Sequence, residues 1–264
     1  MIGFIGAGNM ASAIIRGLAS SGKYNSKDIA VFDICREKAN ELSEELSLTL
    51  MESEKEIAEK CSEVVLAVKP DVFPSLLGKI GEELKASDPL IISIAAGKTT
   101  EFIASLLPYS PRLIRIMPNI NAKVQAAISA YCGNERATES DKAYVKEFCD
   151  SFGRGIEINE KSFSIYSAIG GCSPAFAFMF IDALAMAAVK NGMTKAQALE
   201  TAAQAVLGSA KLILESGEHP RKLVDAVCSP GGTTIEGVCA LQENAFEGTV
   251  EKAVEASFNK DKRL

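Results

Sequence analysis

The chain begins with a short apolar run, residues 2–5, that leads directly into Gly-Ala-Gly-Asn-Met-Ala at residues 6–11. This G-x-G-x-x-A pattern, between a predicted strand and a predicted helix, is typical of the turn that holds the pyrophosphate of a dinucleotide. Gly6 permits the tight turn, Gly8 lets the phosphates approach the backbone, and Ala11 lets the helix pack on the strand. The unpaired N–H groups at the start of the helix face the anion. The pattern alone is weak evidence, so its surroundings decide its interpretation.

Apolar runs of strand length alternate with helical segments through the first half of the chain. The predicted strands are residues 2–5, 29–32, 64–68, 90–94 and 113–116, and the predicted helices are residues 10–20, 36–46, 72–84 and 100–107. Such alternation favours a parallel sheet covered by helices on both faces. A strand at 127–131, a helix at 139–151 and a strand at 155–158 are expected to extend one edge of this sheet.

The pattern changes after about residue 160. Residues 163–258 contain helical periods broken at glycines and prolines and no predicted strand. Thr194 is expected to cap a helix that runs through Glu215, with Gly217 as its C-terminal stop and Pro220 just beyond it. The sequence therefore predicts an α/β, Rossmann-type, doubly wound and mainly parallel domain, residues 1–160, that binds a dinucleotide. An all-α domain, residues 161–264, is expected to follow it.

Three further segments are consistent with a dinucleotide site. Asp33 ends the second predicted strand 22 residues after Ala11, where a carboxylate accepts hydrogen bonds from the ribose of NAD(H). For Arg36 two interpretations stay open, a contact to the 2′-phosphate of NADP(H) or a solvated surface charge. Ligands of open parallel sheets lie beyond the carboxyl ends of the strands. Two further strand ends therefore belong to the same crevice, Ala67-Val68-Lys69-Pro70 and Ala95-Ala96-Gly97. Lys69 is either an acid or a phosphate contact, or it is simply a solvated side chain.

Composition excludes several other classes of function. The chain has 28 Lys and Arg against 34 Asp and Glu, a net charge of −6, whereas a nucleic-acid binder needs a basic face. His219 is the single histidine, so multi-histidine zinc sites are excluded and no metal site is predicted. The seven cysteines are scattered without a C-x-x-C pair, and we expect reduced thiols that are mostly small core residues. No signal peptide is recognised, and the protein is expected to be cytoplasmic.

Long apolar stretches mark the C-terminal half. Residues 175–189 are too few for the roughly 20 that a bilayer requires and include Asp182, so we expect a buried helix and no membrane span. Residues 175–181 and much of 202–214 have no polar face, and such helices must be covered on every side. One helical layer offers too few neighbours, so a partner subunit is the expected cover. The all-α domain is therefore predicted to be a dimerisation domain.

A second glycine turn, Ser229-Pro230-Gly231-Gly232-Thr233-Thr234, precedes an apolar helix start. The N–H groups of such a turn and two hydroxyls can hold a small carboxylate without any arginine. The alternative is that Thr233 or Thr234 simply caps the next helix. The residues by themselves leave both interpretations open.

Several segments, taken in order, resemble the pyrroline-5-carboxylate reductase family. They are GFIGAGNM at residues 3–10, AVKP at 67–70, SIAAG at 93–97, MPN at 117–119, GEHP at 217–220 and CSPGGTTIE at 228–236. The resemblance covers residues 2–258, and SPGGTT is its most specific motif. The chain differs from the family at Ile120-Asn121, where Thr-Pro is usual, and at Asp33, where NADPH-preferring relatives carry small or hydroxyl residues.

The resemblance implies reduction of 1-pyrroline-5-carboxylate to L-proline, the final step of proline biosynthesis, by hydride transfer from NADPH or NADH to a cyclic imine. It implies dinucleotide contacts from the segments at 67–70 and 95–97 and from Ile5, Gly6, Ala7, Gly8, Asn9, Met10 and Asn119. It implies that the substrate carboxylate is held by Ser229, Gly231, Gly232, Thr233 and Thr234, and that the Thr234 hydroxyl, the predicted catalytic group, approaches the ring nitrogen. It also implies a homodimer, or a larger homo-oligomer, built through the C-terminal helices.

Three alternatives remain, of which a purely structural helical oligomer would leave Gly6 and Gly8 unexplained. A related two-domain 3-hydroxy acid dehydrogenase would use a lysine base on a helix just after the domain junction. Here Lys161 precedes that helix, and Gly170-Gly171-Cys172-Ser173 offers no lysine. A non-catalytic protein that senses dinucleotides would not require a second, carboxylate-binding turn. An assay of reduced nicotinamide oxidation with and without pyrroline-5-carboxylate distinguishes the three.

Overall fold

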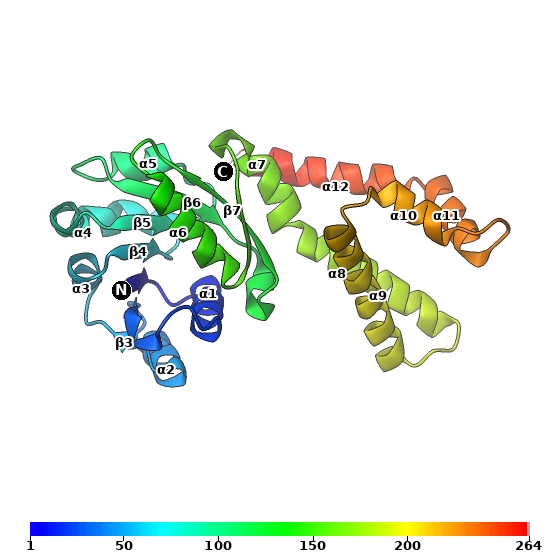
Figure 1. Cartoon of the computed structure of the whole chain (residues 1–264), viewed down its shortest axis with the longest axis horizontal. Coiled ribbons are helices and arrows are strands. Elements are labelled where there is room, and N and C mark those ends of the chain that lie inside the picture. Colours follow the sequence, from blue (N-terminus) through cyan, green and yellow to red (C-terminus); the bar gives the residue numbers. More distant parts are fainter. Residues whose placement is uncertain (263–264) are drawn as a thin grey trace. The chain divides into compact units, whose positions relative to one another are not determined.

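The computed structural model describes residues 1–262 and divides into two compact units (Figure 1). The first unit comprises Met1–Gly171 together with residues 260–262, and the second comprises Cys172–Asn259. The first carries all the strands of the described chain, and the second is entirely helical.

An eight-stranded sheet in the order β3-β2-β1-β4-β5-β6-β7-β8 forms the centre of the first unit. Its strands are β1 (Ile2–Ile5), β2 (Ile29–Phe32), β3 (Thr49–Leu50), β4 (Glu63–Leu66), β5 (Leu90–Ser93), β6 (Arg112–Met117), β7 (Ala127–Gly133) and β8 (Gly153–Glu157). Neighbouring strands are parallel except for the antiparallel pair β6 and β7. The chain order reverses between β1 and β4, which is the switch point where open α/β sheets bind ligands. The predicted doubly wound, mainly parallel sheet is confirmed.

Helices cover both faces of this sheet. They are α1 (Asn9–Ser20), α2 (Arg36–Leu46), α3 (Glu54–Lys60), α4 (Phe73–Ser87), α5 (Thr100–Ser105) and α6 (Glu139–Asp150), with short 3₁₀ segments η1 (Ser26–Asp28), η2 (Pro70–Val72), η3 (Ile120–Val124) and η4 (Glu160–Ser162). The prediction missed β3 and α3. The strand has only two residues, and α3 buries only Ile57 and Ala58 in a charged segment, so neither leaves a clear hydrophobic period.

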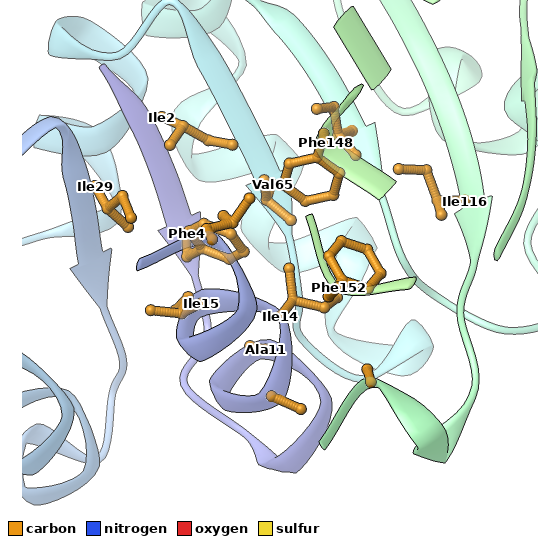
Figure 2. Packing of buried hydrophobic residues seen from close by; sticks show 14 of the residues in the cluster. Ile2, Phe4, Ala11, Ile14, Ile15, Ile29, Val65, Ile116, Phe148 and Phe152 are labelled. Atoms are coloured by element: carbon orange, nitrogen blue, oxygen red, sulfur yellow. The ribbon is translucent and has the colours of Figure 1, made fainter. Parts of the chain in front are cut away.

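Two apolar clusters lie on opposite faces of the sheet because successive strand residues point to opposite sides. Phe4 of β1 packs with Ile14 and Ile15 of α1 and with Phe148 and Phe152 on the α6 side, as Figure 2 shows. The next residue of β1, Ile5, belongs instead to the cluster formed with α3, α4 and α5. Burial on both faces accounts for the continuous apolar strands seen in the sequence.

The first unit extends past residue 160, where the sequence analysis put the domain boundary. Helix α7 (Phe163–Tyr166) and the π-helix η5 (Ser167–Gly171) pack against the sheet. The Tyr166 hydroxyl donates to the Ile128 carbonyl at 2.8 Å, and Asn119 Nδ2 donates to the Gly170 carbonyl at 2.8 Å. These hydrogen bonds hold residues 160–171 on the edge of the sheet, so the compact unit ends at Gly171.

The second unit consists of α8 (Ser173–Lys190), α9 (Lys195–Ser216), α10 (Pro220–Val227), α11 (Thr233–Glu243) and most of α12 (Phe246–Asp261). The predicted limits of α9 are confirmed. The Thr194 side chain accepts from the Gln197 N–H at the start, and Gly217, with φ 66°, ends the helix in the left-handed region.

The prediction that residues 175–189 form a buried helix is wrong for a single chain. Phe178 is 58% exposed and Met179 is 73% exposed, because α9 packs on only one face of α8. By length and composition alone, the helical stretch Glu160–Lys190 is apolar enough to cross a membrane. Its first part, however, packs on the sheet, and the 18 residues of α8 fall short of the roughly 20 that a bilayer needs.

Candidate dinucleotide and substrate sites

The two glycines of the first turn are required for different reasons. Gly6 has φ +111°, and a Cβ there would lie 2.7 Å from the Ala67 carbonyl oxygen, so the fold itself excludes a side chain. Gly8 is the N-cap of α1 with φ −70°, and a Cβ there would meet no protein atom within 4 Å. The space in front of Gly8 is therefore open to a ligand. No side chain caps α1, and its first turn holds no acidic residue, so the N–H groups there are available to an anion.

Asp33 lies at the carboxyl end of β2 and contacts the same turn. Its Oδ2 accepts from the Ala7 N–H at 2.6 Å, and its Oδ1 accepts from the Cys35 N–H at 2.8 Å. Two backbone donors thus hold the carboxylate beside the glycine turn.

Arg36 is exposed in the structure and forms contacts with the segment after β3. Its guanidinium donates to the Met51 carbonyl at 3.1 Å, to the Glu52 carbonyl at 2.8 Å and to Glu52 Oε2 at 2.7 Å. It also lies over the Phe32 ring, 5.5 Å from the centroid. Arg36 therefore connects the start of α2 to the segment after β3. No local sequence pattern predicts this contact.

A cavity of about 450 Å³ opens at the carboxyl ends of β1, β2 and β4 and is lined by seven of the sixteen predicted cofactor residues. Those that line it are Ile5, Gly6, Gly8, Asp33, Ala67, Val68 and Lys69. Sequence analysis missed Ile34, which is 94% exposed at the same cavity, although an apolar residue in a polar loop was a usable signal. The largely apolar side chains around Ile34 and Leu76 suit a flat aromatic ring.

A second cavity of about 530 Å³ lies on the other side of Gly8, between α1 and α2. Ala7, Gly8 and Asn9 line it together with two lysines that the sequence analysis did not select, Lys38 and Lys123. Lys123 comes from η3, more than a hundred residues further along the chain, so only the folded structure brings it to the turn.

The remaining predicted cofactor residues do not line these two cavities. They are Met10, Arg36, Pro70, Ala95, Ala96, Gly97 and Asn119. Met10 packs against the core, and Ala95 is buried, whereas Ala96 and Gly97 lie in an exposed turn with φ +73° at Gly97. The Asn119 side chain is buried and already bonded, to the Gly170 carbonyl and to the Asn121 N–H.

The second glycine turn leaves the start of α11 free of side-chain caps. The N-cap is Gly232, so the interpretation that Thr233 or Thr234 caps the helix is wrong. Both threonines are exposed and occupy the first two helical positions. Gly231 has φ +67°, in the left-handed region that favours glycine, and a Cβ on Gly232 would require the Ser229 side chain to move.

One expected donor is already in use. The Gly232 N–H donates to the Ser229 carbonyl at 3.0 Å. This N–H was expected to bind the substrate carboxylate, but it already has an acceptor. The N–H groups of Thr233 and Thr234 lie at the positive end of α11, where they have no acceptor within the helix. With the Ser229 and threonine hydroxyls they form a compact group of donors without a charged side chain.

The other reactive side chains of the described residues offer no second kind of site. No group of three His, Cys, Asp or Glu residues there can hold a metal ion. All seven cysteines are free, but only Cys61, Cys132 and Cys149 are buried, so the expectation that most are core residues is wrong. Burial raises the pKa of Cys61 to about 11 and that of Cys132 to about 12, which makes these thiols poor nucleophiles.

Comparison with known proteins agrees with this geometry. Residues 160–264 match the family model described as pyrroline-5-carboxylate reductase dimerisation, and residues 1–97 match one described as NADP oxidoreductase, coenzyme F420-dependent. The pyrroline-5-carboxylate reductase of Escherichia coli K12 is 41% identical over 263 residues, covering 100% of this chain and 97% of that protein. The Aquifex aeolicus protein of the same name is 37% identical with the same coverage.

Solved structures show the same fold over nearly the whole chain. The pyrroline-5-carboxylate reductase of Coxiella burnetii superposes with a TM-score of 0.94 at 31% identity, covering 99% of this chain and 97% of that one. The Plasmodium falciparum enzyme, solved with NADP bound, has a TM-score of 0.87 at 32% identity and the same coverage. Identity above 30% over the full length, together with the two glycine turns, shows that this chain belongs to the pyrroline-5-carboxylate reductase family.

Proposed function

We propose that this chain performs its family's reaction with a dinucleotide held by the turn before α1 and a substrate carboxylate held by the turn before α11. The reaction is the NAD(P)H-dependent reduction of 1-pyrroline-5-carboxylate to L-proline. The observation that carries this proposal is the start of α11. Gly232 caps the helix, so the hydroxyls of Thr233 and Thr234 and their N–H groups are left for an anion.

The first unit acts as the dinucleotide-binding domain. The N–H groups at the start of α1 bind the pyrophosphate, which approaches the backbone at Gly8, where no protein atom is in the way. The apolar cavity beside Ile34 receives the adenine ring. The bound nicotinamide supplies the hydride, and the protein supplies position and electrostatics.

The second unit orients the substrate. Ser229 Oγ and the N–H groups of Thr233 and Thr234 bind the carboxylate, and the Thr234 hydroxyl forms a hydrogen bond with the ring nitrogen. A cyclic imine that enters already protonated needs no strong acid from the protein. This agrees with the single histidine of the chain, His219, whose Nδ1 accepts from the Arg221 N–H at the start of α10. Fixing the approach of the reacting carbons is then the main catalytic contribution.

The exposed helices support a proposal about assembly. We infer that the apolar residues of α8 and α9, among them Phe178 and Met179, are buried between two copies of this chain, in line with the dimerisation family model. A homodimer or a larger homo-oligomer in the cytoplasm is the form that we propose.

The test of function measures the oxidation of NADH or NADPH with and without pyrroline-5-carboxylate. The Gly8→Ala variant then tests the dinucleotide turn. The added Cβ meets no protein atom, so the melting temperature should fall only by the small cost of alanine at an N-cap. Binding of NADH and NADPH should fall by tenfold or more, roughly the 1.4 kcal/mol that such a factor represents.

The matched control is Gly78→Ala in α4, where a Cβ also meets nothing and no ligand is proposed. It should bind both dinucleotides like the unchanged protein. If Gly8→Ala also binds them normally, the turn before α1 does not hold the pyrophosphate, and the dinucleotide site must be sought elsewhere.

A further inference from the structure

The carboxylate of Asp33 is held in a defined place at the dinucleotide cavity. Each of its oxygens accepts one backbone hydrogen bond, Oδ2 from Ala7 at 2.6 Å and Oδ1 from Cys35 at 2.8 Å. An ionised carboxylate offers about four acceptor positions in all, so about one on each oxygen remains. The cavity that Asp33 lines is also lined by Gly6 and Gly8, where the proposed dinucleotide lies. The two free positions match the two hydroxyls of an unmodified ribose.

No cation of the described residues forms an ion pair with this carboxylate. Arg36 is the cation expected to bind a 2′-phosphate, but its guanidinium donates hydrogen bonds to Glu52 and to two backbone carbonyls. Lys79 lines the cavity but forms an ion pair with Glu54. Lys69 also lines the cavity, but no ion pair joins it to Asp33 among the described residues. The Asp33 carboxylate is therefore a negative charge at the end of β2 that no described cation pairs with.

From this arrangement we infer that Asp33 is a specificity-determining residue that makes the chain prefer NADH to NADPH. The inference rests on the proposed dinucleotide site. The 2′-phosphate of NADPH would lie within a few ångströms of the fixed carboxylate, and the two negative charges would repel each other. The phosphate also takes the place of the 2′-hydroxyl, whose hydrogen bond the carboxylate would otherwise accept. We expect kcat/KM and affinity to favour NADH by about ten- to a hundred-fold.

The experiment compares NADH with NADPH in two ways. One is kcat/KM with pyrroline-5-carboxylate, and the other is Kd measured by isothermal titration calorimetry without substrate. Asp33→Ser should lower the preference for NADH by about ten- to a hundred-fold. Asp33→Asn keeps the size of the side chain and removes its charge, so it should shift the preference in the same direction even if the serine variant folds poorly.

Two further variants make the test specific. Glu41→Gln removes a negative charge that lines the neighbouring cavity without contacting the turn, and the preference should stay within twofold of the unchanged protein. Arg36→Ala should also leave the preference unchanged. A selective loss of NADPH binding in Arg36→Ala would mean that Arg36 leaves Glu52 to bind the phosphate, which would overturn the inference.

The outcomes separate this inference from the proposed function. Equal Kd values for the two dinucleotides, or an unchanged ratio in both Asp33 variants, would refute the role of Asp33 while leaving the reductase activity intact. A clear NADH preference in Kd, with no oxidation of either dinucleotide by pyrroline-5-carboxylate, would support Asp33 and refute the proposed reaction.

Discussion

Replacing Thr234 by alanine separates a catalytic hydroxyl from a structural one. Thr234 is the second residue of α11, is exposed, and makes no side-chain hydrogen bond that caps the helix, since Gly232 occupies the N-cap. Removing the hydroxyl should therefore change the free energy of unfolding by less than about 0.5 kcal/mol, as for other surface substitutions. A true threonine cap would cost about 1 kcal/mol.

The effect on catalysis should be much larger. If the hydroxyl binds the ring nitrogen, Thr234→Ala loses one or two positioned hydrogen bonds, ~1.4–4 kcal/mol, and kcat/KM for pyrroline-5-carboxylate falls by ~10- to 10³-fold. The Kd of the dinucleotide should barely change, because its turn lies in the first unit. Thr234→Ser restores the hydroxyl and should recover most of the activity.

The assay pairs kcat/KM with the melting temperature. Thr249→Ala is the control, because its hydroxyl donates to the Ala245 carbonyl at 3.0 Å in the first turn of α12, away from the proposed substrate turn. It should keep kcat/KM unchanged. A Thr234→Ala protein with normal kcat/KM refutes the reasoning whatever its melting temperature, and the substrate nitrogen must then meet another group.

Two more predictions concern assembly and the first turn. Met179→Glu puts a charge on the exposed face of α8, so sedimentation at micromolar concentration should show monomers where the unchanged chain is dimeric or larger. A stable, active monomer of the unchanged chain would contradict the proposed interface. Gly6→Ala, at φ +111° and 2.7 Å from a carbonyl oxygen, should lower stability by roughly 1–3 kcal/mol. A normal melting temperature for Gly6→Ala would show that the turn can relax.

Local chemistry was enough to predict much of the first unit. The apolar run of β1, the glycines after it and the helix that follows are properties of neighbouring residues, so their pattern predicts a strand, a turn and a helix in that order. The limits of α9 were equally predictable, since Thr194 and Gly217 act on backbone groups within one turn. Segments without a strong local pattern, β3 and α3, were missed because their place depends on contacts with the rest of the sheet.

By itself, then, the sequence determined the doubly wound sheet, the dinucleotide turn and the family, because repeated periods and contiguous motifs carry that information. Tertiary structure alone decided which partner each polar group takes. Arg36 is bonded to Glu52, and Asn119 to Gly170, across loops that no periodic pattern spans. It also decided that Gly232 caps α11, and so left Thr234 free. The packing of whole helices and strands determines which groups far apart in the chain come within hydrogen-bonding distance. These partners can therefore be identified only in the folded structure.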